Sequence, residues 1–111
     1  MAEDFDSRNS FAVVWTVDTE DSELYKHTIA DQATKLLELW TNGVVENVYL
    51  DNKTPDEALT VKKGDRGKVV FFIKARTESD ARKVLDEMPL VKKKVAKYTL
   101  FPVGVLWLKQ F

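Results

Sequence analysis

The chain has no cysteine, and its 111 residues include only three prolines and four glycines. Without cysteine it forms no disulfide, carries no thiolate nucleophile and offers no sulfur ligand to a metal. This disfavours a disulfide-stabilised secreted domain. The acidic, polar segment 1–10 (MAEDFDSRNS) is also unlike the basic and then apolar start of a signal peptide. We therefore expect a flexible tail at 1–10 and a cytoplasmic protein.

Long apolar runs, excess positive charge and several catalytic motifs are also missing. No run approaches the roughly 18 apolar residues of a membrane span. The chain has 17 basic and 18 acidic residues, so its net charge of −1 does not attract nucleic acid or an anionic membrane. We expect neither as a partner. The motifs G-x-G-x-x-G, G-x-S-x-G and H-E-x-x-H and the Walker loop are absent, so the sequence indicates no cofactor.

What the chain does have is apolar and aromatic residues, at 44% and 11% of its length. This is enough for one packed domain, which we expect to span residues 11–111. Strand-like and helix-like periodicities alternate along it. They predict strands at 11–17, 44–50, 68–76 and 98–108, and helices at 22–41 and 77–88. The order βαββαβ predicts an α+β, ferredoxin-like fold with a four-stranded antiparallel sheet and two helices on one face.

Two of the predicted strands are apolar on both faces. They are Val69–Ile73 and Phe101–Leu108. One layer of helices covers only one face of a sheet, and a half-covered antiparallel sheet normally alternates apolar with polar residues. Apolar character on both faces predicts a cover for the second face, most simply another copy of the chain. The sequence therefore predicts a homodimer.

Gln32 is the polar residue that the helix pattern singles out. At about 100° per residue, it lies in the arc around Tyr25 that is predicted to face the sheet. The other members of this arc are Ile29, Ala33, Leu36 and Trp40. A buried amide without a partner costs about 1 to 3 kcal/mol, so Gln32 either bonds to the core or presents its donor and acceptor to a ligand.

The single histidine, His27, falls on the opposite side of the same helix, beside Asp31. We expect a solvated surface pair there, and no metal site, because no further ligand lies at a useful spacing. The aromatic residues either wall a pocket for a planar ligand or belong to the core and dimer contact. The polar segment 51–67 is long for a hairpin connection, and either a functional loop or a surface insertion explains it.

Two local patterns carry a resemblance to a known family. The first runs from Ala30-Asp31-Gln32 to Asn42-Gly43-Val44, and the second is Met88-Pro89-Leu90-Val91 followed by Val95 and Tyr98. They resemble the dimeric α/β-barrel superfamily, especially its muconolactone isomerase and YciI-like branches. The resemblance implies two ferredoxin-like sheets packed face to face. It also implies a Glu or His at the position of Gln32, facing a helix–sheet cleft, where an amide cannot transfer a proton at neutral pH.

Three functions remain open. One is an isomerase-like enzyme that acts on a small cyclic or unsaturated acid. In it Gln32 orients the substrate, a proton donor comes from Tyr25, Tyr49 or Glu46, and the cleft is lined by Trp15, Ile29, Leu36, Trp40 and Phe71. The second is a non-catalytic homodimeric binding or scaffold protein. The third is a small monooxygenase of the same superfamily, against which the outward His27 argues. Glu46 or Tyr49 directed at Gln32 favours the enzyme, whereas a cleft filled by Trp15 and Trp40 favours the scaffold.

Overall fold

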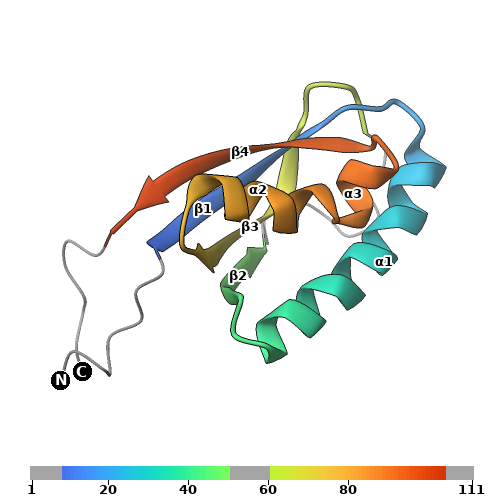
Figure 1. The fold of residues 1–111 in the computed structure, drawn as a ribbon. Helices are drawn as coiled ribbons and strands as arrows, with labels where there is room; N and C mark the ends of the chain where they lie inside the picture. The colour runs from blue at the N-terminus through green and yellow to red at the C-terminus, as the bar shows by residue number, and fades with distance from the viewer. Residues whose placement is uncertain (1–8, 51–60, 105–111) are drawn as a thin grey trace, which may run out of the picture.

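The computed structural model describes residues 9–50 and 61–104, and the rest of the chain lies outside the described residues. Seven elements follow one another along the chain (Figure 1). They are β1 (Asn9–Val17), α1 (Ser22–Thr41), β2 (Val45–Leu50), β3 (Arg66–Ala75), α2 (Glu78–Asp86), α3 (Pro89–Lys92) and β4 (Ala96–Val103). Residues 1–8 of the predicted tail, residues 51–60 of the loop at 51–67 and the last residues of the predicted fourth strand are outside these limits. The remaining two tail residues, Asn9 and Ser10, are not a flexible tail but begin β1, where they pair with Ala75 and Lys74.

The four strands form one antiparallel sheet in the order β2-β3-β1-β4, with all the helices on one face (Figure 1). Each helical connection passes over one strand, so β1 and β2 are separated by β3, and β3 and β4 by β1. This is the split βαβ arrangement of a ferredoxin-like domain, and it confirms the predicted fold class. The core lies between sheet and helices, where Phe71, Ile73 and Leu85 are fully buried.

Local signals at both ends of α1 explain why the helix has its predicted bounds. The Asp21 carboxylate accepts the Leu24 N–H at 3.0 Å as an N-cap. At the other end the Gly43 N–H donates to the Trp40 carbonyl at 3.1 Å, and the Val44 N–H donates to the Leu39 carbonyl at 2.9 Å. This is a Schellman motif, and Gly43 adopts its left-handed conformation with φ of +78°.

The buried side of α1 differs from the predicted arc. Its buried residues are Tyr25, Thr28 and Gln32, whereas Ala33 is exposed and Trp40 is 56% exposed. The buried stripe is thus rotated by about 60° on the helical wheel. The rotation follows from packing, because α1 lies against α3 as well as β2, and the sequence pattern alone predicts no contact with α3.

The region after α2 also differs from the prediction. Thr77 Oγ1 accepts the Asp80 N–H at 3.1 Å, so the predicted cap of the second helix is confirmed. The helix ends at Asp86, however, and Pro89 begins the short helix α3 where a connecting loop was predicted. Proline is well suited to a first helical position because its missing N–H would have no partner there. Strand β4 then starts two residues earlier than predicted, at Ala96.

Gly67 allows a close approach between β3 and β1. A Cβ atom at this position would lie 2.7 Å from the Cβ of Trp15, a buried residue, beside the irregular register between Val14 and Thr16. Gly67→Ala should therefore lower the free energy of unfolding by about 1 to 3 kcal/mol, as measured by chemical denaturation. Gly104→Ala is the control, because its Cβ would meet no atom within 4 Å. Equal stability of the two variants would contradict the close packing.

Candidate functional site

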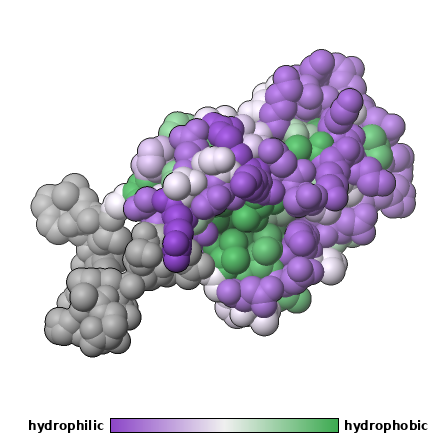
Figure 2. Space-filling view, in the orientation of Figure 1, coloured by the Kyte–Doolittle hydropathy of each residue, from purple (hydrophilic) through white to green (hydrophobic). Residues whose placement is uncertain are grey.

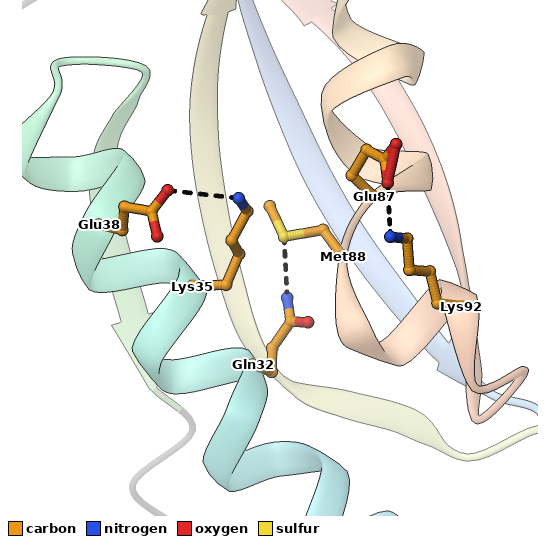
Figure 3. Close-up of polar contacts among 6 residues, drawn as sticks. All are labelled: Gln32, Lys35, Glu38, Glu87, Met88 and Lys92. Carbon is orange, nitrogen blue, oxygen red and sulfur yellow. Dashed lines mark hydrogen bonds and ion pairs between the residues drawn. The ribbon is translucent and has the colours of Figure 1, made fainter.

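Gln32 joins α1 to the junction between α2 and α3. Its side chain is buried, with 3% of the residue exposed. Its Oε1 accepts the Leu90 N–H at 3.2 Å, and its Nε2 donates to the Met88 sulfur at 3.4 Å (Figure 3). The amide therefore has a partner on each side, as the core-amide alternative requires.

The two partners of Gln32 differ in strength. The Leu90 N–H is a normal amide donor, but a thioether sulfur is a weak acceptor. A ligand oxygen would therefore be a stronger acceptor for the Gln32 Nε2–H group than the Met88 sulfur is. The methionine side chain has three rotatable bonds, but Met88 is fully buried, so a ligand oxygen would have to displace it from the core. Nothing in the sequence links Met88 to Gln32, because the contact spans 56 residues.

Charged residues flank this contact on both helices (Figure 3). On α1, Lys35 Nζ lies 3.4 Å from Glu38 Oε1. On the other side, Lys92 Nζ lies 2.7 Å from Glu87 Oε2. The hydrogen bond from Lys92 lowers the pKa of Glu87, and Lys35 contributes a smaller electrostatic effect across the gap between the helices. Glu87 thus stays ionised at neutral pH, and its solvent-exposed pair adds little to stability.

Hydrophobic side chains reach the surface between α1 and α2. Figure 2 shows them as a green area surrounded by hydrophilic residues. The half-buried residues Leu36 and Leu39 of α1 and Val84 of α2 pack against the core from these two helices. Ile29 is also half-buried, so two of the predicted ligand-lining residues, Ile29 and Leu36, do lie on the core-facing side of α1.

The structure does not bring Glu46 and Tyr49 to Gln32. Glu46 accepts a hydrogen bond from Ser10 Oγ at 3.0 Å and lies 3.7 Å from Lys74 Nζ. The Tyr49 ring packs against Phe72 with centroids 6.1 Å apart. All of these side chains lie on the sheet face opposite the helices, so neither residue is directed into the predicted cleft.

An irregularity in β2 explains the position of Tyr49. Val45 pairs with Ile73, but Val48 pairs with Phe71 and Tyr49 with Val70, so one extra residue lies between the two pairings. Strict alternation from the buried Val45 would direct residue 49 toward the helices, and the extra residue reverses this. Because of this bulge, Tyr49 lies on the sheet face opposite the helices and not in the predicted cleft.

The other predicted site residues occupy separate places. Tyr25 is buried two turns before Gln32, about 10 Å along the helix axis. Burial, and to a smaller extent Asp65, raises the pKa of Tyr25, so the phenol is protonated and not a base at neutral pH. Trp15 and Phe71 are core residues with ring centroids 6.0 Å apart. The exposed Trp40 and the buried Trp15 do not fill a common cleft.

His27 points away from the sheet, as predicted. Its side chain is 80% exposed, and its Nε2 lies 3.9 Å from Glu23 Oε2, one turn earlier in α1. The expected surface pair therefore exists, but with Glu23 in place of Asp31. A pair this exposed contributes little to stability.

The sheet face away from the helices is mainly apolar, and no helix of residues 9–50 and 61–104 covers it. We call it the outer face, and by strand register it comprises Ser10, Ala12, Val14, Thr16, Arg66, Val70, Phe72, Lys74, Lys97, Thr99, Phe101 and Val103, with Glu46 and Tyr49 at its edge. Ala12 pairs with Phe72 on one side and Phe101 on the other, so a small residue lies between two rings. Phe101 is 50% exposed, Tyr49 58% and Val103 39%.

Among residues 9–50 and 61–104, no helix is both long and apolar enough to cross a membrane. The same part of the chain holds no cluster of three or more His, Cys, Asp or Glu side chains that could share a metal ion.

Fold and described residues together define a ferredoxin-like α+β domain with a polar contact between its helices and an apolar outer face. No protein-family model matches the chain, and no curated protein matches its sequence. Among solved structures, it is similar to 5-chloro-2-hydroxyhydroquinone dehydrochlorinase (TftG) from Burkholderia phenoliruptrix, in complex with 2,5-dihydroxybenzoquinone. The TM-score is 0.58 over 85% of this chain and 93% of that chain, at 9% sequence identity. This likeness shows a shared fold.

Proposed function

We propose that the protein is a homodimer of the dimeric α/β-barrel type that binds a small planar organic ligand between α1 and the α2–α3 junction. The observation that carries the proposal is the apolar outer face, which one layer of helices on the other side leaves uncovered. The resemblance to the muconolactone isomerase and YciI-like branches supports the same arrangement. A cytoplasmic location is part of this proposal.

A second copy of the chain is the occupant that best suits the outer face. The face is a sheet surface, and a two-fold related sheet has by definition the same shape and apolarity. The ring of Phe72 or Phe101 from one sheet can fill the shallow position over Ala12 of the other. Two of the charged residues of the outer face, Glu46 and Lys74, are 3.7 Å apart within one chain and offset each other. Arg66 and Lys97 both pair with Thr16, at one end of the face.

Gln32 is the residue that we propose contacts the ligand. Its Nε2 donates to a sulfur atom, and a ligand carbonyl or hydroxyl oxygen would be a stronger acceptor than Met88. The apolar side chains between α1 and α2 would pack on the ligand body. Because Glu46 and Tyr49 lie on the other face of the sheet, we propose ligand binding and not proton transfer as the role of Gln32.

A titration with 2,5-dihydroxybenzoquinone, the molecule bound to the structural neighbour, tests the ligand site. The chain has two methionines, so the methyl resonance of Met88 is a specific probe in an NMR experiment. We expect this resonance to shift on binding, and Gln32→Leu to weaken binding by about 1 to 3 kcal/mol. His27→Ala is the control, with unchanged affinity, since His27 points to solvent. An unmoved Met88 methyl group, or equal affinity of Gln32→Leu, would contradict the proposed site.

A further inference from the structure

A surface depression of about 270 Å³ lies between α3 and the start of β4, away from the Gln32 contact. Its walls come from the end of β1, from α3 and the turn that follows it, and from β4. The lining residues are Asp18, Val91, Lys94, Ala96, Lys97 and Tyr98. They include two lysines beside an apolar surface. Neither the packing of the fold nor the proposed ligand site explains this combination.

Lys94 adopts a backbone conformation that usually belongs to glycine. Its φ is +58°, and it is the one non-glycine residue with positive φ in the described part of the chain. The Lys94 N–H donates to the Val91 carbonyl at 3.0 Å and the Val95 N–H to the Leu90 carbonyl at 2.9 Å. This is the same Schellman motif that ends α1, where Gly43 occupies the equivalent position. A Cβ atom is unfavourable in this conformation, so the side chain of Lys94 is kept at a cost.

The lysines around the depression outnumber their carboxylate partners. Asp18 Oδ1 lies 3.7 Å from Lys97 Nζ and 3.8 Å from Lys63 Nζ, so one carboxylate serves two ammonium groups. No carboxylate pairs with Lys94 among residues 9–50 and 61–104. The depression therefore has a positive charge that a bound anion would neutralise.

The Tyr98 ring, the largest apolar group of the depression, is held by several contacts. The Tyr98 ring packs edge-on against Trp15 with centroids 6.0 Å apart, and its hydroxyl donates to Asp86 Oδ1 at 2.8 Å. The guanidinium carbon of Arg82 lies 5.6 Å from the centre of the same ring. These contacts restrict the ring, and Val91 and Ala96 complete an apolar wall beside the two lysines.

We propose that this depression binds a small organic carboxylate with a single planar ring. The carboxylate contacts Lys94 and Lys97, and the ring packs on Tyr98 and the neighbouring aliphatic side chains. The charge accounts for the anion, and the apolar wall favours a ring-bearing acid over inorganic phosphate. This site is independent of Gln32.

Benzoate is a suitable probe, with its neutral isostere benzamide as the matched ligand. In an NMR titration of the full chain, benzoate should shift the resonances of Val91, Ala96 and Tyr98. Benzamide and inorganic phosphate should each bind at least about fivefold more weakly. The Met88 methyl resonance should not shift with benzoate, which separates this site from the proposed ligand site.

Lys94→Gly gives the sharpest test because its two effects have opposite signs. Glycine relieves the backbone, so the melting temperature should rise by about 2 to 5 °C. Removal of the ammonium group should weaken benzoate binding about fivefold to tenfold. Lys97→Gln, on the strand, should weaken binding by a similar factor. Lys93→Gly is the control: it makes the same change one residue earlier, at an exposed position with negative φ, and should leave the affinity unchanged.

Four results would overturn the proposal. Equal affinity for benzoate and benzamide would show that the lysines do not select an anion, and tight binding of phosphate would remove the role of the ring. Unchanged benzoate affinity in both Lys94→Gly and Lys97→Gln would show that these ammonium groups do not contact the ligand. A melting temperature of Lys94→Gly below that of the wild type would remove the evidence that the lysine is retained at a cost.

Discussion

Phe101→Glu should convert the proposed dimer into folded monomers at micromolar concentration. Phe101 is 50% exposed in the single chain, so a glutamate there remains in contact with water and the monomer keeps its fold. In the proposed dimer the same carboxylate would lie between two apolar sheets without a partner. An unpaired buried charge costs several kcal/mol, which exceeds what a neighbouring contact can supply. Sedimentation velocity or light scattering measures the change in mass directly.

The control for Phe101→Glu is Leu37→Glu. Leu37 lies on α1, is 61% exposed, and undergoes the same change from an apolar residue to glutamate. We expect it to remain dimeric because α1 lies on the opposite side of the sheet. A Phe101→Glu variant that stays dimeric would contradict the assignment of the outer face as the interface. So would a Leu37→Glu variant that becomes monomeric with its fold intact.

Gln32→Glu should lower the stability of the protein at neutral pH. In acid, the stability of the variant should return most of the way to that of the wild type. A protonated carboxyl group can replace the amide, since its carbonyl accepts the Leu90 N–H and its hydroxyl faces Met88. The ionised carboxylate has no hydrogen-bond donor for the Met88 sulfur, and its burial removes the water that would otherwise solvate its charge. We expect the free energy of unfolding at pH 7.5 to fall by about 2 to 4 kcal/mol.

The pH dependence of Gln32→Glu follows from the same burial. Burial raises the pKa of the introduced carboxyl above its value of about 4.3 in the unfolded chain. The variant therefore loses stability relative to the wild type as pH rises above about 4, until the folded-state pKa is passed. Denaturation curves at pH 4 and pH 7.5 measure the difference. Asn47→Asp, the same change at an exposed position, should show no such dependence. If the stability difference between Gln32→Glu and the wild type were the same at pH 4 and pH 7.5, this would contradict the buried contact.

Much of the fold follows from local patterns in the sequence. Runs of β-branched and aromatic residues identify β1 and β3, and the helical period identifies α1 and α2. Side chains next to the helices then define the ends, since Asp21 and Thr77 cap the first turns and Gly43 closes α1. These signals act over a few residues, so the sequence alone is sufficient to predict them.

The site was harder to predict because its geometry depends on contacts between distant segments. The bulge in β2 exists only against the register of β3, and it moves Tyr49 to the outer face. The short helix α3 has too few residues for a periodic pattern, yet it supplies the Leu90 N–H to Gln32 and rotates the buried side of α1. The burial of Gln32 followed from the helical wheel, but its partners did not.

The mass of the wild-type chain in solution tests the central claim most directly. Multi-angle light scattering on the full chain, at a concentration of a few micromolar, distinguishes one copy from two without any mutation. The apolar outer face predicts a single species with twice the mass of one chain. A monodisperse species with the mass of a single chain would contradict the account, since the outer face would then be stable in water without a second copy.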